Sequence, residues 1–169
     1  PDLLTKSVAS ALVELGVVRV ELDALTLCDR VLQGCGRPYS GAYVRSMARG
    51  LRALGVEVGL VLSPGLPGTD HASALRDARE ACDLADVVRL HPLLVLSDAK
   101  IREAHMDGRY EPLTLGEAVT TCRAMMDVLE AGGVEVIRVG IQGTHDGVGR
   151  VVAGPAHGAL RELVECRRM

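Results

Sequence analysis

The residues best suited to bind a charged group are an arginine and a histidine on one expected strand. Arg89 and His91 alternate with Val88 and Leu90, and alternation along a strand directs both polar side chains to the same face. An arginine buried there needs an anionic partner, and Glu21 on an earlier expected strand can provide it. Two plainer interpretations remain open, with His91 as a core histidine held by backbone groups and Glu21 as a charged residue at the solvent rim.

A loop rich in glycine and proline is a second candidate for contact with a ligand. It runs from Ser63 to Gly68, and Gly65 within it would let the backbone approach a cofactor closely. A rigid turn into the following helix explains the same residues. His145 and Asp146 lie in another glycine-rich loop, which can be either a metal or phosphate site or a mobile loop without such a role.

The cysteines and the other histidines form no recognised set of metal ligands or catalytic groups. Cys28 and Cys35 have no third cysteine nearby, and the histidines are too far apart for a zinc motif such as HExxH. Cys28, at an expected junction of strand and helix, can be a reactive thiol or, more commonly, a buried and inert residue. The sequence therefore predicts no metal site within the chain and assigns no catalytic residue.

Three helical patterns that end in glycine indicate where these candidates would lie. Each glycine supplies a left-handed helix cap, and the Val-rich run after it suits a strand covered on both faces. A further buried-looking strand extends from Val87 to Leu96. Strands that alternate with helices predict an α/β fold of parallel βα units, as a partial (β/α) barrel or a small open sheet. The glycines are Gly16, Gly55 and Gly133, and the expected helix caps are Ser40, Asp70 and Thr114, the last in a capping box with Glu117.

Composition limits the number of domains and the kinds of partner. The chain has 169 residues, of which 48% are hydrophobic, so it can bury one substantial core. We divide this single domain into a partial barrel over residues 1–142 and a loop with a C-terminal helix over residues 143–169. A net charge of −3 with scattered arginines, no Phe or Trp and three Tyr disfavours binding of nucleic acid by this segment alone.

Cysteine usage and hydropathy point to a cytoplasmic chain without membrane contact. The five cysteines are dispersed, no secretory signal precedes them, and no apolar run reaches the roughly 20 residues that span a bilayer. The missing initiator methionine suggests a processed or truncated polypeptide. Four parallel strands have two edges with unpaired N–H and C=O groups. We therefore expect a second copy of the chain, another protein partner or the rest of a larger sheet to cover those edges.

An ordered series of segments carries a resemblance to a known family. The series is Val20-Glu21-Leu22, Asp29-Arg30-Val31-Leu32 with Arg37, Gly65-Leu66-Pro67-Gly68, Val88 to Leu96, Gly108-Arg109-Tyr110-Glu111-Pro112, Ile137 to Gln142, and Gly154-Pro155-Ala156-His157 with Arg161 to Glu165. Over nearly the whole chain it resembles the radical S-adenosylmethionine (SAM) proteins related to the elongator catalytic subunit. The resemblance implies strands four to six of a partial barrel, followed by one more strand and helix. It also implies a SAM pocket lined by Glu21, Gly65, Arg89 and His91.

The sequence departs from that family in two respects. The family holds a [4Fe–4S] cluster with three closely spaced cysteines, because thiolates at close spacing are what such clusters require, and no CxxxCxxC arrangement occurs here. SAM and [4Fe–4S] are thus implied only if a cluster-bearing half exists elsewhere in the polypeptide, and no cofactor is expected within this chain alone. Leu25 stands where the family carries an amide, and Arg37-Pro38-Tyr39 replaces the family's Arg-Gly-His.

Two main hypotheses follow. In the first, the chain is the C-terminal half of an elongator-type radical SAM protein, which is an enzyme only together with its cluster-bearing half. In the second, it is a degenerate, non-catalytic α/β scaffold that serves as a protein-interaction module and can dimerise. A small-molecule binding protein that uses the crevice at the strand ends is a third reading. In all three we expect Tyr110 to anchor a loop by packing.

Overall fold

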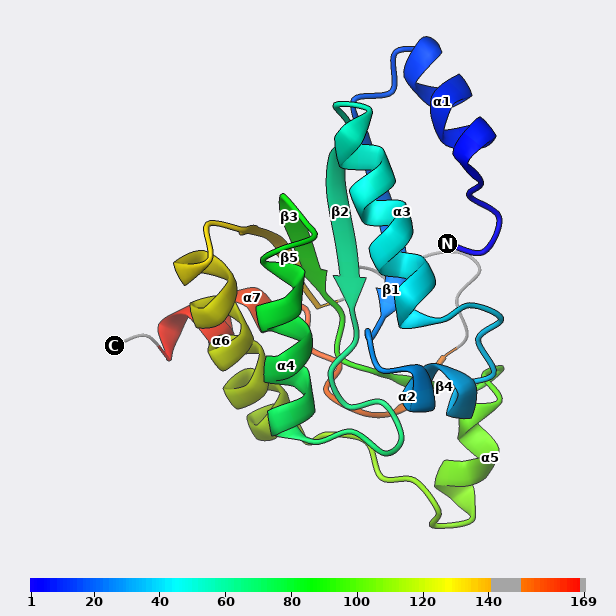
Figure 1. Cartoon of the computed structure of the whole chain (residues 1–169). Coiled ribbons are helices and arrows are strands. Elements are labelled where there is room, and N and C mark those ends of the chain that lie inside the picture. Colours follow the sequence, from blue (N-terminus) through cyan, green and yellow to red (C-terminus); the bar gives the residue numbers. More distant parts are fainter. Residues whose placement is uncertain (141–149, 168–169) are drawn as a thin grey trace.

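The computed structural model describes residues 1–140 and 150–167. Its central sheet has four parallel strands in the order β1-β2-β3-β5, connected through helices (Figure 1). Strands β1 and β5 are its edges, so the described strands form an open sheet, and the expected α/β class is confirmed. The elements are α1 (Lys6–Glu14), β1 (Arg19–Leu25), α2 (Asp29–Gly34), α3 (Gly41–Ala53), β2 (Glu57–Leu62), α4 (His71–Ala81), β3 (Val87–Leu90), β4 (Val95–Leu96), α5 (Ile101–Met106), α6 (Leu115–Ala131), β5 (Glu135–Val139), β6 (Val151–Ala153) and α7 (Leu160–Cys166).

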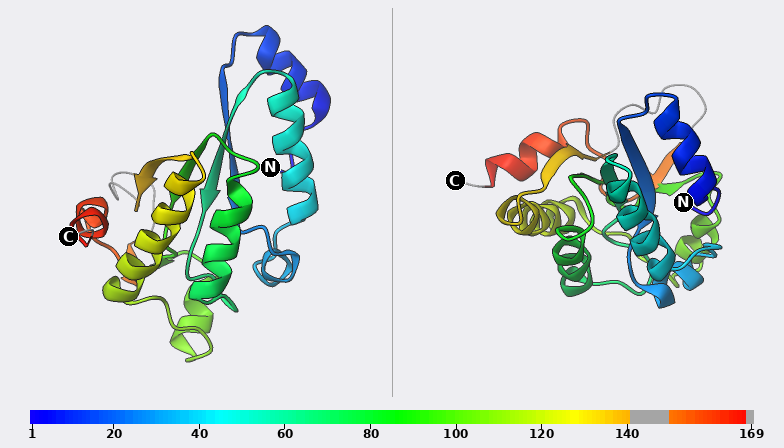
Figure 2. Two further views of the ribbon diagram at one scale, coloured as in Figure 1. Left: turned by 60° about the vertical axis from the view of Figure 1, so that its left-hand side comes forward. Right: turned by 45° about the horizontal axis from the view of Figure 1, so that its top comes forward.

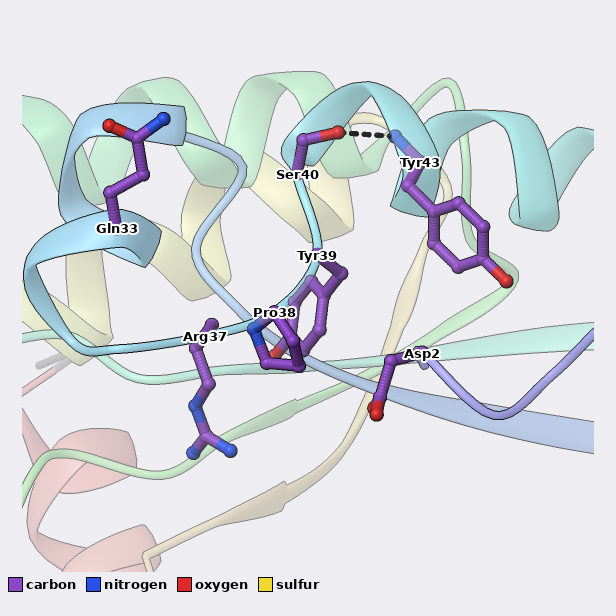
Figure 3. Close-up of a pocket in the computed structure, with 7 residues that line it drawn as sticks. All are labelled: Asp2, Gln33, Arg37, Pro38, Tyr39, Ser40 and Tyr43. Atoms are coloured by element: carbon purple, nitrogen blue, oxygen red, sulfur yellow. Dashed lines mark hydrogen bonds between the residues drawn. The ribbon is translucent and has the colours of Figure 1, made fainter.

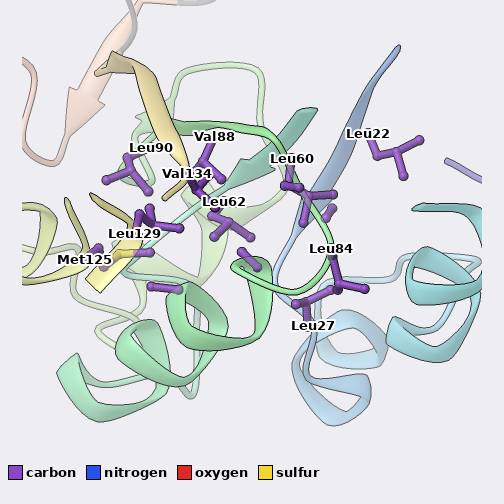
Figure 4. Close-up of a cluster of buried hydrophobic side chains, with 14 of the residues drawn as sticks. Leu22, Leu27, Leu60, Leu62, Leu84, Val88, Leu90, Met125, Leu129 and Val134 are labelled. Atoms are coloured by element: carbon purple, nitrogen blue, oxygen red, sulfur yellow. The ribbon is translucent and has the colours of Figure 1, made fainter. Parts of the chain in front are cut away.

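Helices α3, α4 and α6 pack against one face of the central sheet (Figures 1 and 2). Leu22, Leu60 and Val88 occupy adjoining positions on that face of three neighbouring strands, and each is at most 2% exposed (Figure 4). Complete burial of such a side chain stabilises the fold by about 1.5–3 kcal/mol. Because side chains alternate along a strand, the residues between them project on the opposite face.

The expected helix caps are present. The Ser40 hydroxyl accepts a hydrogen bond from the Tyr43 N–H at 3.1 Å (Figure 3), and Asp70 caps α4 in the same way. Thr114 and Glu117 form the expected capping box at the start of α6. Each helix predicted to have a glycine cap is followed by that glycine with positive φ, at Gly16, Gly55 and Gly133.

The expected strand from Val87 to Leu96 is not continuous. Strand β3 ends at Leu90, because Pro92 has no N–H to donate to a neighbouring strand. The His91 N–H still reaches the Leu62 carbonyl at 2.8 Å, but the chain then leaves the sheet. Strand β4 begins after four intervening residues and pairs antiparallel with β6. The expected continuation of β5 through residues 141–142 lies outside the described residues.

The loop after β1 is tied to the helices by polar groups. The Leu27 N–H donates to Asp77 Oδ1 of α4 at 3.0 Å, and Arg45 Nη2 of α3 donates to the Leu27 carbonyl at 3.1 Å. Burial raises the pKa of Asp77, although hydrogen bonds from Thr26 and Leu27 act in the other direction. These bonds fix the segment through which the chain leaves the carboxyl end of β1.

The described helices include none that combines the length and the apolar character needed to cross a membrane.

Candidate functional site

Charged residues gather on the face of the sheet opposite to α3, α4 and α6. We call this the charged face, and define it by Arg19, Glu21, Glu57, Arg89 and Arg138. Glu21 of β1 and Arg89 of β3 form an ion pair there, and Arg89 Nη2 donates to Glu21 Oε1 at 2.8 Å. Strand β2 lies between their strands, so the pair spans the middle strand of three.

Gly59 of β2 permits this ion pair. It is aligned with Glu21 in the β1–β2 register, and a Cβ atom added to it would lie 2.6 Å from Glu21 Cγ. Carbon atoms do not approach so closely, so any larger residue would displace the glutamate. The glycine therefore supplies the space through which the Glu21 side chain reaches Arg89.

The charges around the pair keep Glu21 ionised. The hydrogen bond from Arg89 is the main cause that lowers the pKa of Glu21, and Arg19 and Arg138 act in the same direction. Arg138 is aligned with Arg89 in the β3–β5 register, which brings a second guanidinium to the same part of the face. The side chains of Arg89 and Glu21 remain 26% and 27% exposed, so a ligand can reach them.

His91 follows Arg89 at the end of β3 and carries a polar atom that is not satisfied. Its Nε2 is buried and has no hydrogen-bond partner among the described residues. Burial holds the pKa of the imidazole below its ordinary value, and the positive charges of Arg138 and Arg89 add to this effect. The ring is therefore neutral near pH 7, and its Nε2 lies beneath the surface.

Gly65 has different neighbours from the other three candidate residues. It has φ +88°, and an added Cβ would lie 2.9 Å from Leu113 Cγ. The Tyr110 hydroxyl donates to the Gly65 carbonyl at 2.6 Å. Burial raises the pKa of Tyr110 to about 12, so this hydroxyl keeps its proton. The expected role of Tyr110 as a packed loop anchor is confirmed, whereas Glu21, Arg89 and His91 are brought together elsewhere.

The remaining candidates are dispersed. Cys28 is exposed at the start of α2, so the expectation of a buried thiol there was wrong, because the chain turns it outward at the helix start. Over residues 1–140 and 150–167, no group of three or more His, Cys, Asp or Glu side chains is arranged to hold a metal ion. His145 and Asp146 lie outside the described residues.

Two members of the site were missed by sequence reasoning. Gly59 sits inside a strand whose other residues after Glu57 are Val and Leu, and a lone glycine in such a run signals close approach by another group. Arg138 alternates with apolar residues in β5 as Arg89 does in β3. Both signals are present in the sequence, but the alignment of the two arginines depends on a register shift between β3 and β5.

The chain shows similarity to known proteins by sequence and by structure. The Radical_SAM C-terminal domain model matches residues 85–169. Two tRNA uridine(34) acetyltransferases, from Methanocaldococcus jannaschii and Methanocaldococcus infernus, are 27% and 25% identical to it over 123 residues. A solved structure of the archaeal Methanocaldococcus infernus Elp3 with an N-terminal deletion (1–46) matches with a TM-score of 0.82 and 23% identity, which supports likeness of fold.

These matches cover unequal shares of the two chains. Each sequence match includes 70% of this chain but 23% of the relative, so the chain spans about a quarter of the length of those proteins. The structural match includes 96% of this chain and 38% of the Elp3 chain. The described fold thus corresponds to one part of a larger protein in each comparison.

Replacing Gly59 tests the geometry of the ion pair. We expect Gly59→Ala to lower the free energy of unfolding by about 1–3 kcal/mol, because the added carbon displaces Glu21 in a packed place. The matched control is Gly50→Ala in α3, where nothing lies within 4 Å of the added carbon; it should stabilise the fold by about 0.5–1 kcal/mol. Urea unfolding measures the free energy of unfolding of both variants. An unchanged free energy of unfolding in Gly59→Ala would contradict the geometry.

The state of His91 gives a dependence of stability on pH. The unfolded chain binds a proton on this residue below about pH 6.5, whereas the folded imidazole resists protonation because its pKa is lowered. The contribution of neutral His91 to the free energy of unfolding is therefore complete above about pH 6.5. It is lost as the pH falls towards the folded pKa of the imidazole. We expect His91→Gln to flatten the decrease in unfolding free energy below about pH 6.5. Parallel slopes for the two proteins would show that His91 is not buried in its neutral form.

Proposed function

Since this chain belongs to the Radical_SAM C-terminal domain family, we propose that its sheet provides the later strands of a radical SAM barrel and the wall that binds SAM. The observation that carries the proposal is the Glu21–Arg89 ion pair beside His91 on the charged face. In a barrel of parallel strands, the face turned away from the surrounding helices is the interior. The charged face is that face here.

The donor set of the charged face fits the amino acid portion and the ribose of SAM. The carboxylate of SAM matches the guanidinium of Arg89, whose side chain is 26% exposed beside Glu21. Glu21 can accept hydrogen bonds from the ammonium group or the ribose hydroxyls. When bound, SAM supplies the deoxyadenosyl group for radical chemistry. The residues of this chain bind and orient it.

The same residues do not fit the [4Fe–4S] cluster. Cluster ligation needs closely spaced thiolates, and no such set occurs among the described residues. We propose that the cluster is held by another part of the polypeptide, and that the chain is catalytic only in combination with that part. The five free cysteines support a reducing compartment such as the cytoplasm.

The substrate proposed for the complete protein is a uridine of tRNA, because the relatives are tRNA uridine(34) acetyltransferases. This segment has a net charge of −3 and very few aromatic residues. Binding of a phosphate backbone favours clustered positive charge, and stacking on bases favours aromatic side chains. The contacts that hold tRNA are therefore assigned to other parts of the protein.

The binding of SAM can be tested in the longest natural polypeptide that contains this chain, reconstituted without oxygen. We expect Arg89→Met and Glu21→Gln each to raise the Kd for SAM by about tenfold or more, the effect of losing one charge-assisted hydrogen bond. The matched control is Arg52→Gln on α3, a helix that covers the opposite face of the sheet, and it removes a surface ion pair with Asp86. Calorimetry measures the Kd.

Three results would overturn this proposal. The first is absence of the iron–sulfur absorption near about 400 nm in the reconstituted protein. The second is binding of SAM that responds to Arg52→Gln as strongly as to Arg89→Met. The third is unaltered affinity in both variants of the Glu21–Arg89 pair, provided that unfolding measurements show the variants to be folded.

We propose as a second candidate function that the chain is a protein-interaction module. Strand β1 forms one edge of the sheet, and large apolar side chains are exposed just before it, with Leu15 81% and Val18 77% accessible. An edge of this kind pairs readily with another strand. A second copy of the chain is the proposed occupant of the edge, in a homodimer.

Sedimentation velocity across a wide range of concentration tests this second candidate. We expect concentration-dependent dimers that are abolished by Val18→Lys, because a charge beside the edge opposes strand pairing. Val8→Lys on α1 is the matched control, since Val8 is also exposed but lies away from the strand. A monomer at every concentration would exclude the homodimer.

A further inference from the structure

A cavity of about 480 Å³ lies at the carboxyl end of the sheet. It is enclosed by the segments that follow β1, β2 and β3, which lie beside α2 and α5 in Figure 1. Its size is that of small-molecule sites, which run from about 300 to about 1,000 Å³. None of the candidate residues Glu21, Gly65, Arg89 and His91 lines it, so it is a separate place from the charged face.

The lining combines an apolar surface with positive charge. Leu66 is buried, Leu25 and Leu93 are half-buried, and Arg37 and Lys100 are exposed at the rim. Among the described residues that line the cavity, none is acidic, and neither of the two cations forms an ion pair with another described residue. An anionic group would therefore meet two cations that are not already neutralised.

The backbone at Leu25 is a second, independent observation. Its φ is +60°, and it is the only residue other than glycine with positive φ in the part of the chain that the structure describes. Left-handed backbone is disfavoured for a leucine and persists where the surroundings enforce it, often at ligand sites. Here the Leu25 carbonyl accepts the Ser63 N–H at 2.7 Å. This strained residue contributes to the wall of the cavity.

The wall on the side of α5 is held in place by hydrogen bonds. The Ala104 carbonyl accepts the N–H groups of Arg109 and Tyr110 at 2.8 and 3.0 Å. The Tyr110 hydroxyl in turn donates to Gly65 in the loop after β2. Two of the segments that enclose the cavity are thereby joined to each other, so the cavity exists before any ligand arrives.

We propose that this cavity binds a small organic anion with an apolar body, whose negative group lies between Arg37 and Lys100 and whose apolar part contacts Leu25, Leu66 and Leu93. Leu25 selects for the apolar part, since a polar ligand atom placed against it would lose its hydrogen bond to water. This site stands independently of SAM binding. It would remain if the proposed radical SAM function failed.

Two fluorescent probes that differ by one charged group test the site. Anilinonaphthalene sulfonate carries an apolar body and an anion, and phenylnaphthylamine is the same body without the sulfonate. We expect saturable binding of both by the folded chain, and by the longest natural polypeptide that contains it. The double variant Arg37→Gln/Lys100→Gln should weaken binding of the sulfonate by about three- to tenfold, as for two exposed charges. It should leave the neutral probe within about twofold of its original affinity, because only the anion meets those charges.

The controls separate this cavity from other surfaces. Arg102 is an exposed residue of α5 that does not line the cavity. Its replacement in Arg102→Gln should leave the binding of both probes unaffected. Ala104→Phe should fill the cavity and abolish binding of both probes, and Ala99→Phe repeats the test from a second wall should the first variant not fold. The proposal is overturned if both probes bind the filled variants normally, or if the double variant behaves like Arg102→Gln.

Discussion

Long helices cover only one face of the four-stranded parallel sheet, so the other face must be stabilised by different interactions. This constraint shapes the rest of the molecule. Parallel sheets are normally covered on both sides by apolar layers. Here β1 alternates buried Leu22 and Ala24 with exposed Glu21 and Asp23. The second face is therefore polar at the edge strand, and the charges on it are matched across strands, with Arg19 paired to Glu57 and Glu21 to Arg89.

The Glu21–Arg89 pair positions two charged groups more than it stabilises the fold. A partly exposed ion pair contributes little free energy of folding, about 0–1 kcal/mol. Its effect is to hold a carboxylate and a guanidinium in a fixed arrangement across Gly59, next to a histidine that burial and two arginines keep neutral. The pKa values of Glu21 and His91 both fall, so one group stays charged and the other uncharged at neutral pH. The charged groups that this face offers are thus the carboxylate of Glu21 and the guanidinium of Arg89.

The sequence was sufficient for features that depend on neighbouring residues. Ser40, Asp70 and Thr114 act within one helical turn, and the family resemblance, which rests on the order of short segments, is confirmed by the Radical_SAM C-terminal domain match. Features that depend on residues far apart in the sequence could not be predicted. The surroundings of Gly65 depend on Leu113 and Tyr110, and the position of β4 depends on where β6 offers it a partner.

The two proposed binding sites differ in what holds their residues in place, which explains why both can exist on one small sheet. The charged face obtains its order from residues within strands, whose alternation is rigid. The cavity at the carboxyl end is enclosed by loops, because parallel strands all deliver their following loops to the same edge. There the ordering comes from bonds between loops, such as Tyr110 to Gly65 and Ser63 to Leu25. Loop sequences vary more freely than strands, so the strand face is expected to hold what the family shares, and the cavity to hold what distinguishes this chain.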